Sequence, residues 1–93
     1  MLKDVKTYKL NAQIAICNKI ASEIGLGHYY NASILIRNYL NDNDYLWYKN
    51  VNNIIDNQIS NLFYDIEHKT NNTKLFFRRQ IVKLENYLKL IGN

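Results

Sequence analysis

Asp65 and His68 are the pair of side chains whose spacing comes nearest to that of a metal site. They lie three residues apart, and this spacing places both on one face of a helix. A zinc site needs three or four ligands, and the sequence contains neither an HExxH pattern nor a pair of cysteines to complete the set. We therefore expect no metal site and interpret Asp65 and His68 as a solvated pair at the end of a helix.

The other groups that could carry out catalysis are scattered along the chain. The eight carboxylates form no close set, and Asp42 and Asp44 are interpreted as loop and capping residues. His28 lies in a glycine-containing turn, where it could touch a ligand, although we expect it to face water. The stretch GLG at 25–27 is too short to cradle a phosphate. The sequence therefore predicts a protein that is not an enzyme, with no catalytic residues and no cofactor.

Cys17 is the single cysteine, so an intramolecular disulfide is excluded. Helical spacing puts it beside Ile14, Ala21 and Ile24, and free cysteine is among the most buried residue types. We expect Cys17 to fill the core rather than to act as a nucleophile. The lone cysteine and the short apolar runs also favour a cytoplasmic location, in a bacterial or host cytosol, without membrane insertion.

The elements that must position these residues are helical. Apolar residues recur at intervals of three and four, and no stretch shows the strict alternation of a half-buried strand. We predict an all-α fold, a compact helical bundle that forms a single domain over residues 1–93, with four helices at approximately 4–24, 31–40, 44–68 and 74–91. The expected boundary residues are Gly25 as a C-terminal stop, with Asn31, Asp44 and either Asn72 or Thr73 as N-caps.

Each predicted helix has an apolar stripe that would face the core, and the third helix has the most regular one. In chain order, the residues expected to face inward are Leu10, Ile14, Cys17, Ala21, Ile24, Ala32, Leu35, Ile36, Tyr39, Tyr48, Val51, Ile55, Ile59, Leu62, Ile66, Phe77, Ile81, Leu84, Leu88 and Ile91, with Ile16 and Ile20 widening the first stripe.

The stretch at 20–40 contains a small residue, Ala21, followed four residues later by Gly25 at a turn. Over these twenty or so residues the chain resembles the helix-turn-helix of DNA-binding regulators. It departs from that motif at Asn31, which is polar where an apolar packing residue is required. If a lengthened turn restores the register, Ser33, Arg37 and Asn38 would face the DNA groove, and the alternative is an ordinary corner of the bundle.

The last predicted helix carries cations on the side opposite its core stripe, namely Lys74, Arg78, Arg79, Lys83 and Lys89. Clustered cations of this kind suit phosphate contacts. Leu75 and Val82 lie among them, however, and a mixed cationic and aliphatic surface suits a protein groove or a subunit contact at least as well. A face that is simply solvated is the third alternative.

Aromatic residues are more numerous than one small core easily absorbs, with eight Tyr, three Phe and one Trp. Tyr29 and Tyr30 lie near the glycine turn, whereas Trp47 and Tyr64 fall off the main stripe of their helix. Such residues are enriched at binding hot spots and stack on unpaired bases, and packing in the core is the alternative. Trp47 and Tyr64 would need a second layer, either the first helix or another copy of the chain in a homodimer.

The formal net charge of +4 favours an acidic partner. Our first hypothesis is a non-catalytic, small basic regulatory protein of a mobile genetic element such as a phage or plasmid, associated with nucleic acid or with a nucleic-acid-handling protein. The alternative is a protein-directed inhibitor or adaptor, of the phage anti-defence or bacteriocin-immunity type, that acts through the cationic and aliphatic face.

Overall fold

The described part of the chain forms four helices and no strand. The computed structural model describes the backbone at residues 2–42 and 51–92, and the side chains at 7–38 and 53–91. The helices are α1 (Leu2–Gly25), α2 (Tyr29–Asp42), α3 (Val51–His68) and α4 (Asn72–Gly92). The predicted all-α, four-helix fold is therefore confirmed. The predicted cap Asp44 and the start of the predicted third helix, 44–50, lie outside the described residues.

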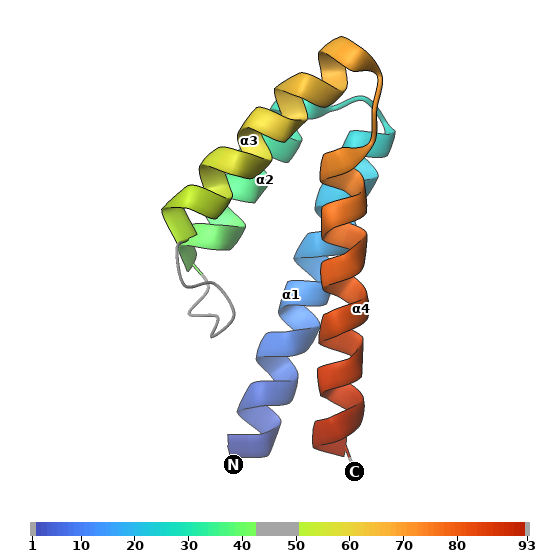
Figure 1. Ribbon diagram of the computed structural model, residues 1–93. Helices are drawn as coiled ribbons and strands as arrows, with labels where there is room; N and C mark the ends of the chain where they lie inside the picture. The colour runs from blue at the N-terminus through green and yellow to red at the C-terminus, as the bar shows by residue number, and fades with distance from the viewer. Residues whose placement is uncertain (1, 43–50, 93) are drawn as a thin grey trace.

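The helices run alternately in opposite directions, and each packs against two neighbours, in the cyclic order α1, α2, α3, α4. Figure 1 shows that α1 and α4 lie side by side along most of their length, whereas the α2–α3 pair leans away from them. The two pairs converge at the end of the bundle that carries the connections at 26–28 and 69–71. The result is an elongated bundle of 45 × 23 × 17 Å along its principal axes.

Three helices begin two residues earlier in the chain than predicted, namely α1, α2 and α4. In α2 and α4 the first helical hydrogen bond is accepted by the carbonyl of the residue just before the helix. The Ala32 N–H donates to the carbonyl of His28 at 3.0 Å, so His28 is the N-cap of α2 and Asn31 lies inside its first turn. In the same way the Leu75 N–H donates to the carbonyl of Asn71 at 3.0 Å, ahead of the predicted caps at 72 and 73. The predictions of Asn31, Asn72 and Thr73 as N-caps are therefore wrong.

The end of α1 depends on Gly27 rather than on Gly25. Gly27 has a φ of 80°, in the left-handed region that residues with a Cβ atom rarely adopt. The N–H groups of Gly27 and His28 then fold back to the carbonyls of Ile24 and Glu23, at 3.0 and 2.8 Å. These bonds satisfy carbonyls that the helix itself leaves free and turn the chain into α2. The helix thus ends at Gly25, within one residue of the prediction, and Gly27 supplies the left-handed turn after it.

The core lies where the four helices meet, and most predicted inward-facing residues belong to it. The buried apolar residues are Leu10, Cys17, Ile20, Ala21, Ile24, Ala32, Ile36, Ile55, Ile59, Leu62, Phe77 and Leu84. Ile14, Ile16, Leu35, Ile81, Leu88 and Ile91 are half-buried and pack against them. The side chains of Tyr39, Tyr48 and Val51 lie outside the described residues.

Ile66 is the exception, because it was predicted to face inward and its side chain is 42% exposed. Its neighbour Asp65 takes the buried position instead, at 3% exposed. The reason is that the Asp65 carboxylate accepts hydrogen bonds from the start of α4, which hold that face of α3 toward α4.

Within the described residues, none of the helices combines the length and the apolar character needed to cross a membrane.

Candidate partner-binding surface

The Asp65 carboxylate serves as a cap for α4 rather than as half of a metal site. Its Oδ2 accepts a hydrogen bond from the backbone N–H of Thr73 at 2.8 Å, and its Oδ1 accepts one from the backbone N–H of Asn72 at 3.2 Å. The Thr70 hydroxyl donates to the same Oδ1 at 2.6 Å, and the Asn72 side-chain amide does so at 3.1 Å. The N–H groups at the start of α4 thus find their acceptor in the last turn of α3.

The predicted pairing of Asp65 with His68 in solvent is wrong for Asp65. His68 is exposed, stacks on the Tyr64 ring with 4.0 Å between centroids, and donates from Nδ1 to the Tyr64 carbonyl at 3.1 Å. Burial of the Asp65 carboxyl raises its pKa, but the hydrogen bonds from Thr70, Thr73 and Asn72 outweigh this and leave the pKa below its usual value. No group of three or more metal-ligating side chains occurs among the described residues.

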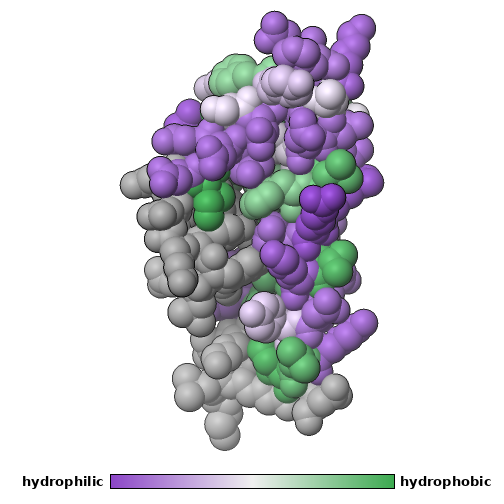
Figure 2. Space-filling view, viewed as in Figure 1, coloured by the Kyte–Doolittle hydropathy of each residue, from purple (hydrophilic) through white to green (hydrophobic). Residues whose placement is uncertain are grey.

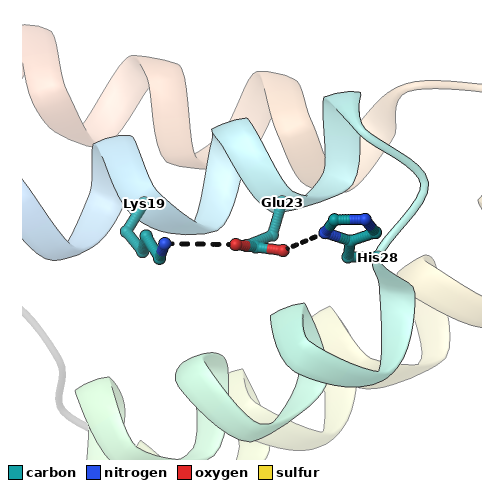
Figure 3. A network of polar contacts seen from close by, with 3 residues as sticks. All are labelled: Lys19, Glu23 and His28. Carbon is teal, nitrogen blue, oxygen red and sulfur yellow. Dashed lines mark hydrogen bonds and ion pairs between the residues drawn. The ribbon is translucent and has the colours of Figure 1, made fainter.

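A second polar cluster joins α1 to the turn that follows it. Figure 3 shows Glu23 between Lys19 and His28. The Lys19 ammonium lies 3.2 Å from Oε1 of Glu23, and Nδ1 of His28 donates to Oε2 at 2.6 Å. Hydrogen bonds from His28 and then from Lys19 lower the pKa of Glu23, against a smaller opposing effect of burial. The His28 side chain is 54% exposed, so it faces water as predicted while its inner nitrogen holds the turn.

Cys17 is fully buried, as predicted for a core residue. A buried thiol away from solvent cannot meet a dissolved substrate.

Three buried glutamines have polar atoms without hydrogen-bond partners among the described residues. Gln13 is 1% exposed and leaves both Oε1 and Nε2 unpaired. Gln58 and Gln80, on α3 and α4, each leave Oε1 unpaired. A buried amide without partners costs free energy, so these positions weaken the centre of the bundle.

The three residues predicted for DNA contact differ in their exposure on α2. Arg37 and Asn38 are exposed, whereas Ser33 is half-buried and its hydroxyl donates to the Tyr30 carbonyl at 2.7 Å. The large apolar side chains Tyr30 and Ile34 occupy the exposed face of α2, at 77% and 39% exposed. Because Arg37 is the only cation in α2, the helix offers little for a phosphate backbone.

The aromatic residues predicted for partner contact also differ in their exposure. Tyr29 is half-buried and packs against the core, whereas Tyr30 is exposed. Tyr64 is 49% exposed and has His68 as its ring partner, so α1 does not cover it. The other alternative, another copy of the chain, stays a prediction. Trp47 lies outside the described residues.

The outer face of α4 carries the remaining candidates, and we call it the α4 strip: Leu75, Arg78, Arg79, Val82, Lys83, Asn86, Lys89 and Leu90. Leu75, Val82 and Leu90 are 46%, 56% and 73% exposed. The four cations of the strip are exposed, and no ion pair joins them to another described residue. Figure 2 shows this face, where apolar patches alternate with hydrophilic ones along the helix. The structure therefore brings these predicted residues together on one accessible surface.

Lys74 lies apart from the strip. It is half-buried, and its amine lies beside Gly25 at the end of α1. A cation there favours the partial negative charge of the helix C-terminus, so this lysine has a structural partner.

The charge of the chain is concentrated on α4. This helix contains five of the twelve cations and one of the eight carboxylates, Glu85. Its own charge of +4 equals the net charge of the whole chain. The attraction for an acidic partner that the composition predicts would therefore come mainly from α4.

Sequence reasoning missed Leu90 and its neighbour Tyr87, which is 51% exposed. Leu90 follows Asn86 by four residues, as Asn86 follows Val82, and these steps could have placed Leu90 at the margin of the strip. Lys83, Asn86, Tyr87 and Leu90 also line a shallow open depression at this end of the strip.

Comparisons of this chain with models of known protein families, with curated proteins and with solved structures found no match.

Proposed function

We propose that this chain is a non-catalytic binding protein that acts on another protein, as an inhibitor or adaptor, through the α4 strip. The observation that carries the proposal is the exposure of Leu75 and Val82 among cations that form no ion pair with another described residue. A partner that covers them removes apolar surface from water, which contributes about 25 cal/mol per Å² covered. A phosphate backbone offers no apolar surface in return.

Nucleic acid is the second candidate, because the charge of the chain is concentrated on one accessible helix face. Cations in such a row can contact successive phosphates without reading sequence. The helix-turn-helix route receives less support, since α2 contributes a single cation. In either case the single buried thiol is consistent with a reducing compartment, so a bacterial or host cytoplasm remains part of the proposal.

The two candidates differ in their response to salt and to loss of the aliphatic side chains. Binding to random duplex DNA or single-stranded RNA would weaken by orders of magnitude between low and physiological salt. Binding to a protein through Leu75 and Val82 would weaken mainly when these two side chains are removed.

The experiment is a gel shift at low and physiological salt beside a pull-down from the native host, with the wild type and a Leu75→Ser, Arg79→Ser, Val82→Ser variant. We expect a specific host protein that the wild type captures and the variant loses, and weak or absent nucleic-acid binding. Salt-sensitive binding of nucleic acid that persists in Leu75→Ser, Val82→Ser would replace this proposal with the second candidate. Capture that is unchanged in the triple variant would contradict a role for the α4 strip.

A further inference from the structure

The apolar side chains of the α4 strip are spread along the helix. Leu75 and Leu90 are fifteen residues apart, which corresponds to roughly 22 Å along the helix axis at about 1.5 Å per residue. Val82 lies between them, seven residues after Leu75 and eight before Leu90. At about 100° per residue, Val82 lies about 20° to one side of Leu75 and Leu90 about 60° to the other. The three apolar side chains form a seam about 80° wide, which suits another helix lying along the first.

Cations flank this seam on both sides. With about 100° between successive residues of a helix, Arg78 and Lys89 fall beyond Val82 on one side of the seam. Lys83 falls beyond Leu90 on the other side, and Arg79 lies within the seam. Cations that flank an apolar seam select a partner helix with acidic residues at the matching flanking positions. Glu85, at the outer margin of the first flank, is the single carboxylate of the helix.

A symmetric dimer through two α4 strips does not meet this requirement. Pairing two α4 strips would bring two helices of charge +4 together, with like charges on both flanks of the seam, and such contacts oppose association. The surface that covers the strip is therefore not a second α4 strip.

We infer that the α4 strip binds an acidic amphipathic α-helix of a partner protein, with the apolar face of that helix on Leu75, Val82 and Leu90 and its carboxylates on the flanking cations. This inference rests on the proposed function and specifies the chemistry of the partner.

The probe for this inference is a fluorescein-labelled peptide designed as an acidic amphipathic helix, with leucines on one stripe and glutamates beside it. One control peptide has the same composition with its leucines distributed around the helix. The other keeps the stripe and replaces each glutamate with lysine. Fluorescence anisotropy with the full-length chain at physiological salt gives the affinity for each peptide. We expect the acidic amphipathic peptide to bind at least about tenfold more tightly than either control.

Variants locate the binding site on the protein. We expect Leu75→Ser, Val82→Ser to weaken the acidic peptide about tenfold. Phe63→Ser, which removes a side chain of α3 that is 66% exposed, should leave the affinity unchanged. Arg79→Glu should weaken the acidic peptide and improve binding of the lysine peptide. All four positions are exposed, so each variant should fold, and circular dichroism checks this.

The inference is overturned if the acidic peptide binds no better than the control with distributed leucines, or if Leu75→Ser, Val82→Ser binds it as well as the wild type does. In that case, host-protein capture that still depends on the α4 strip would leave the proposed function standing with a partner of another shape. If neither peptide binding nor host-protein capture depends on the α4 strip, both the inference and the proposed function are wrong. Tighter binding of duplex DNA than of the acidic peptide, with steep salt dependence, would also overturn the inference.

Discussion

The carboxylate of Asp65 in the last turn of α3 accepts a hydrogen bond from the backbone N–H of Thr73 in the first turn of α4, at 2.8 Å. A single buried side chain thereby caps a helix to which it does not belong. Because α4 carries the proposed binding surface, this contact helps to fix where that surface lies relative to the rest of the bundle.

Replacing Asp65 should destabilise the protein. Asp65→Ala leaves the N–H groups of Asn72 and Thr73 without their acceptor, and we expect the free energy of unfolding to fall by about 2–3 kcal/mol. Urea denaturation followed by circular dichroism measures the loss. The control is Asp56→Ala, which removes an exposed carboxylate from the same helix and should change stability by less than about 0.5 kcal/mol. Equal effects of the two variants would contradict the capping role.

Acid should destabilise the protein through two carboxylates. The pKa values of Asp65 and Glu23 are lower in the folded chain than their usual values. At a pH between the folded and unfolded pKa values, the unfolded chain binds more protons, so stability falls as the pH falls. Their contribution is complete above the usual carboxyl range, near pH 4 to 5, and decreases as the pH falls through the folded values. Urea midpoints measured from pH 7 down to pH 2 should show this decrease, and Asp65→Asn should have a shallower one. An acid limb with the same slope in Asp65→Asn would exclude Asp65 as one of its sources.

The same substitution at two nearby glycines should have opposite effects. Gly27→Ala places a Cβ atom at a φ of 80° and should destabilise the protein by about 1 kcal/mol. Gly25 lies in α1, and a Cβ atom there meets only the flexible end of Lys74, at 3.4 Å. Gly25→Ala should therefore be neutral or stabilising by up to about 1 kcal/mol. Thermal unfolding of both variants gives the comparison, and a larger loss at Gly25 would show that the turn is assigned to the wrong glycine.

Replacing Gln13 with an apolar residue of similar size should stabilise the protein. Both of its amide atoms are buried without a partner among the described residues, so Gln13→Leu should raise the free energy of unfolding by about 1 kcal/mol. Gln13→Glu has a similar shape but buries a charge, and it should reduce stability strongly. If Gln13→Leu is destabilising, the amide has a partner in solution, such as a buried water molecule.

The fold followed from periodicity because the apolar stripes of four helices leave few other ways to bury their residues. The predicted helix boundaries were less accurate. The carbonyls of His28 and Asn71 accept the first hydrogen bonds of α2 and α4, and any residue type can do this. The role of Asp65 could not be read from the sequence for a related reason. Its partners lie seven and eight residues away across a turn, and helical periodicity describes only neighbours within one helix.

Leu75 and Val82 were predicted to be exposed because they lie opposite the core stripe, and both are exposed in the structure. The gathering of Ser33, Arg37 and Asn38 on one face was predicted from a motif whose turn differs from that of this chain. Gly27 takes the left-handed conformation, α2 begins at Tyr29, and Tyr30 and Ile34 are exposed on it.

Cys17, with none of its surface accessible, is also the single sulfhydryl in the sequence. An alkylating reagent can reach it only when the helices around it separate. The rate of its modification therefore counts spontaneous openings of the bundle without any engineered label. A maleimide dye attached to a cysteine introduced on the α4 strip would, for the same reason, mark that position alone in the native protein.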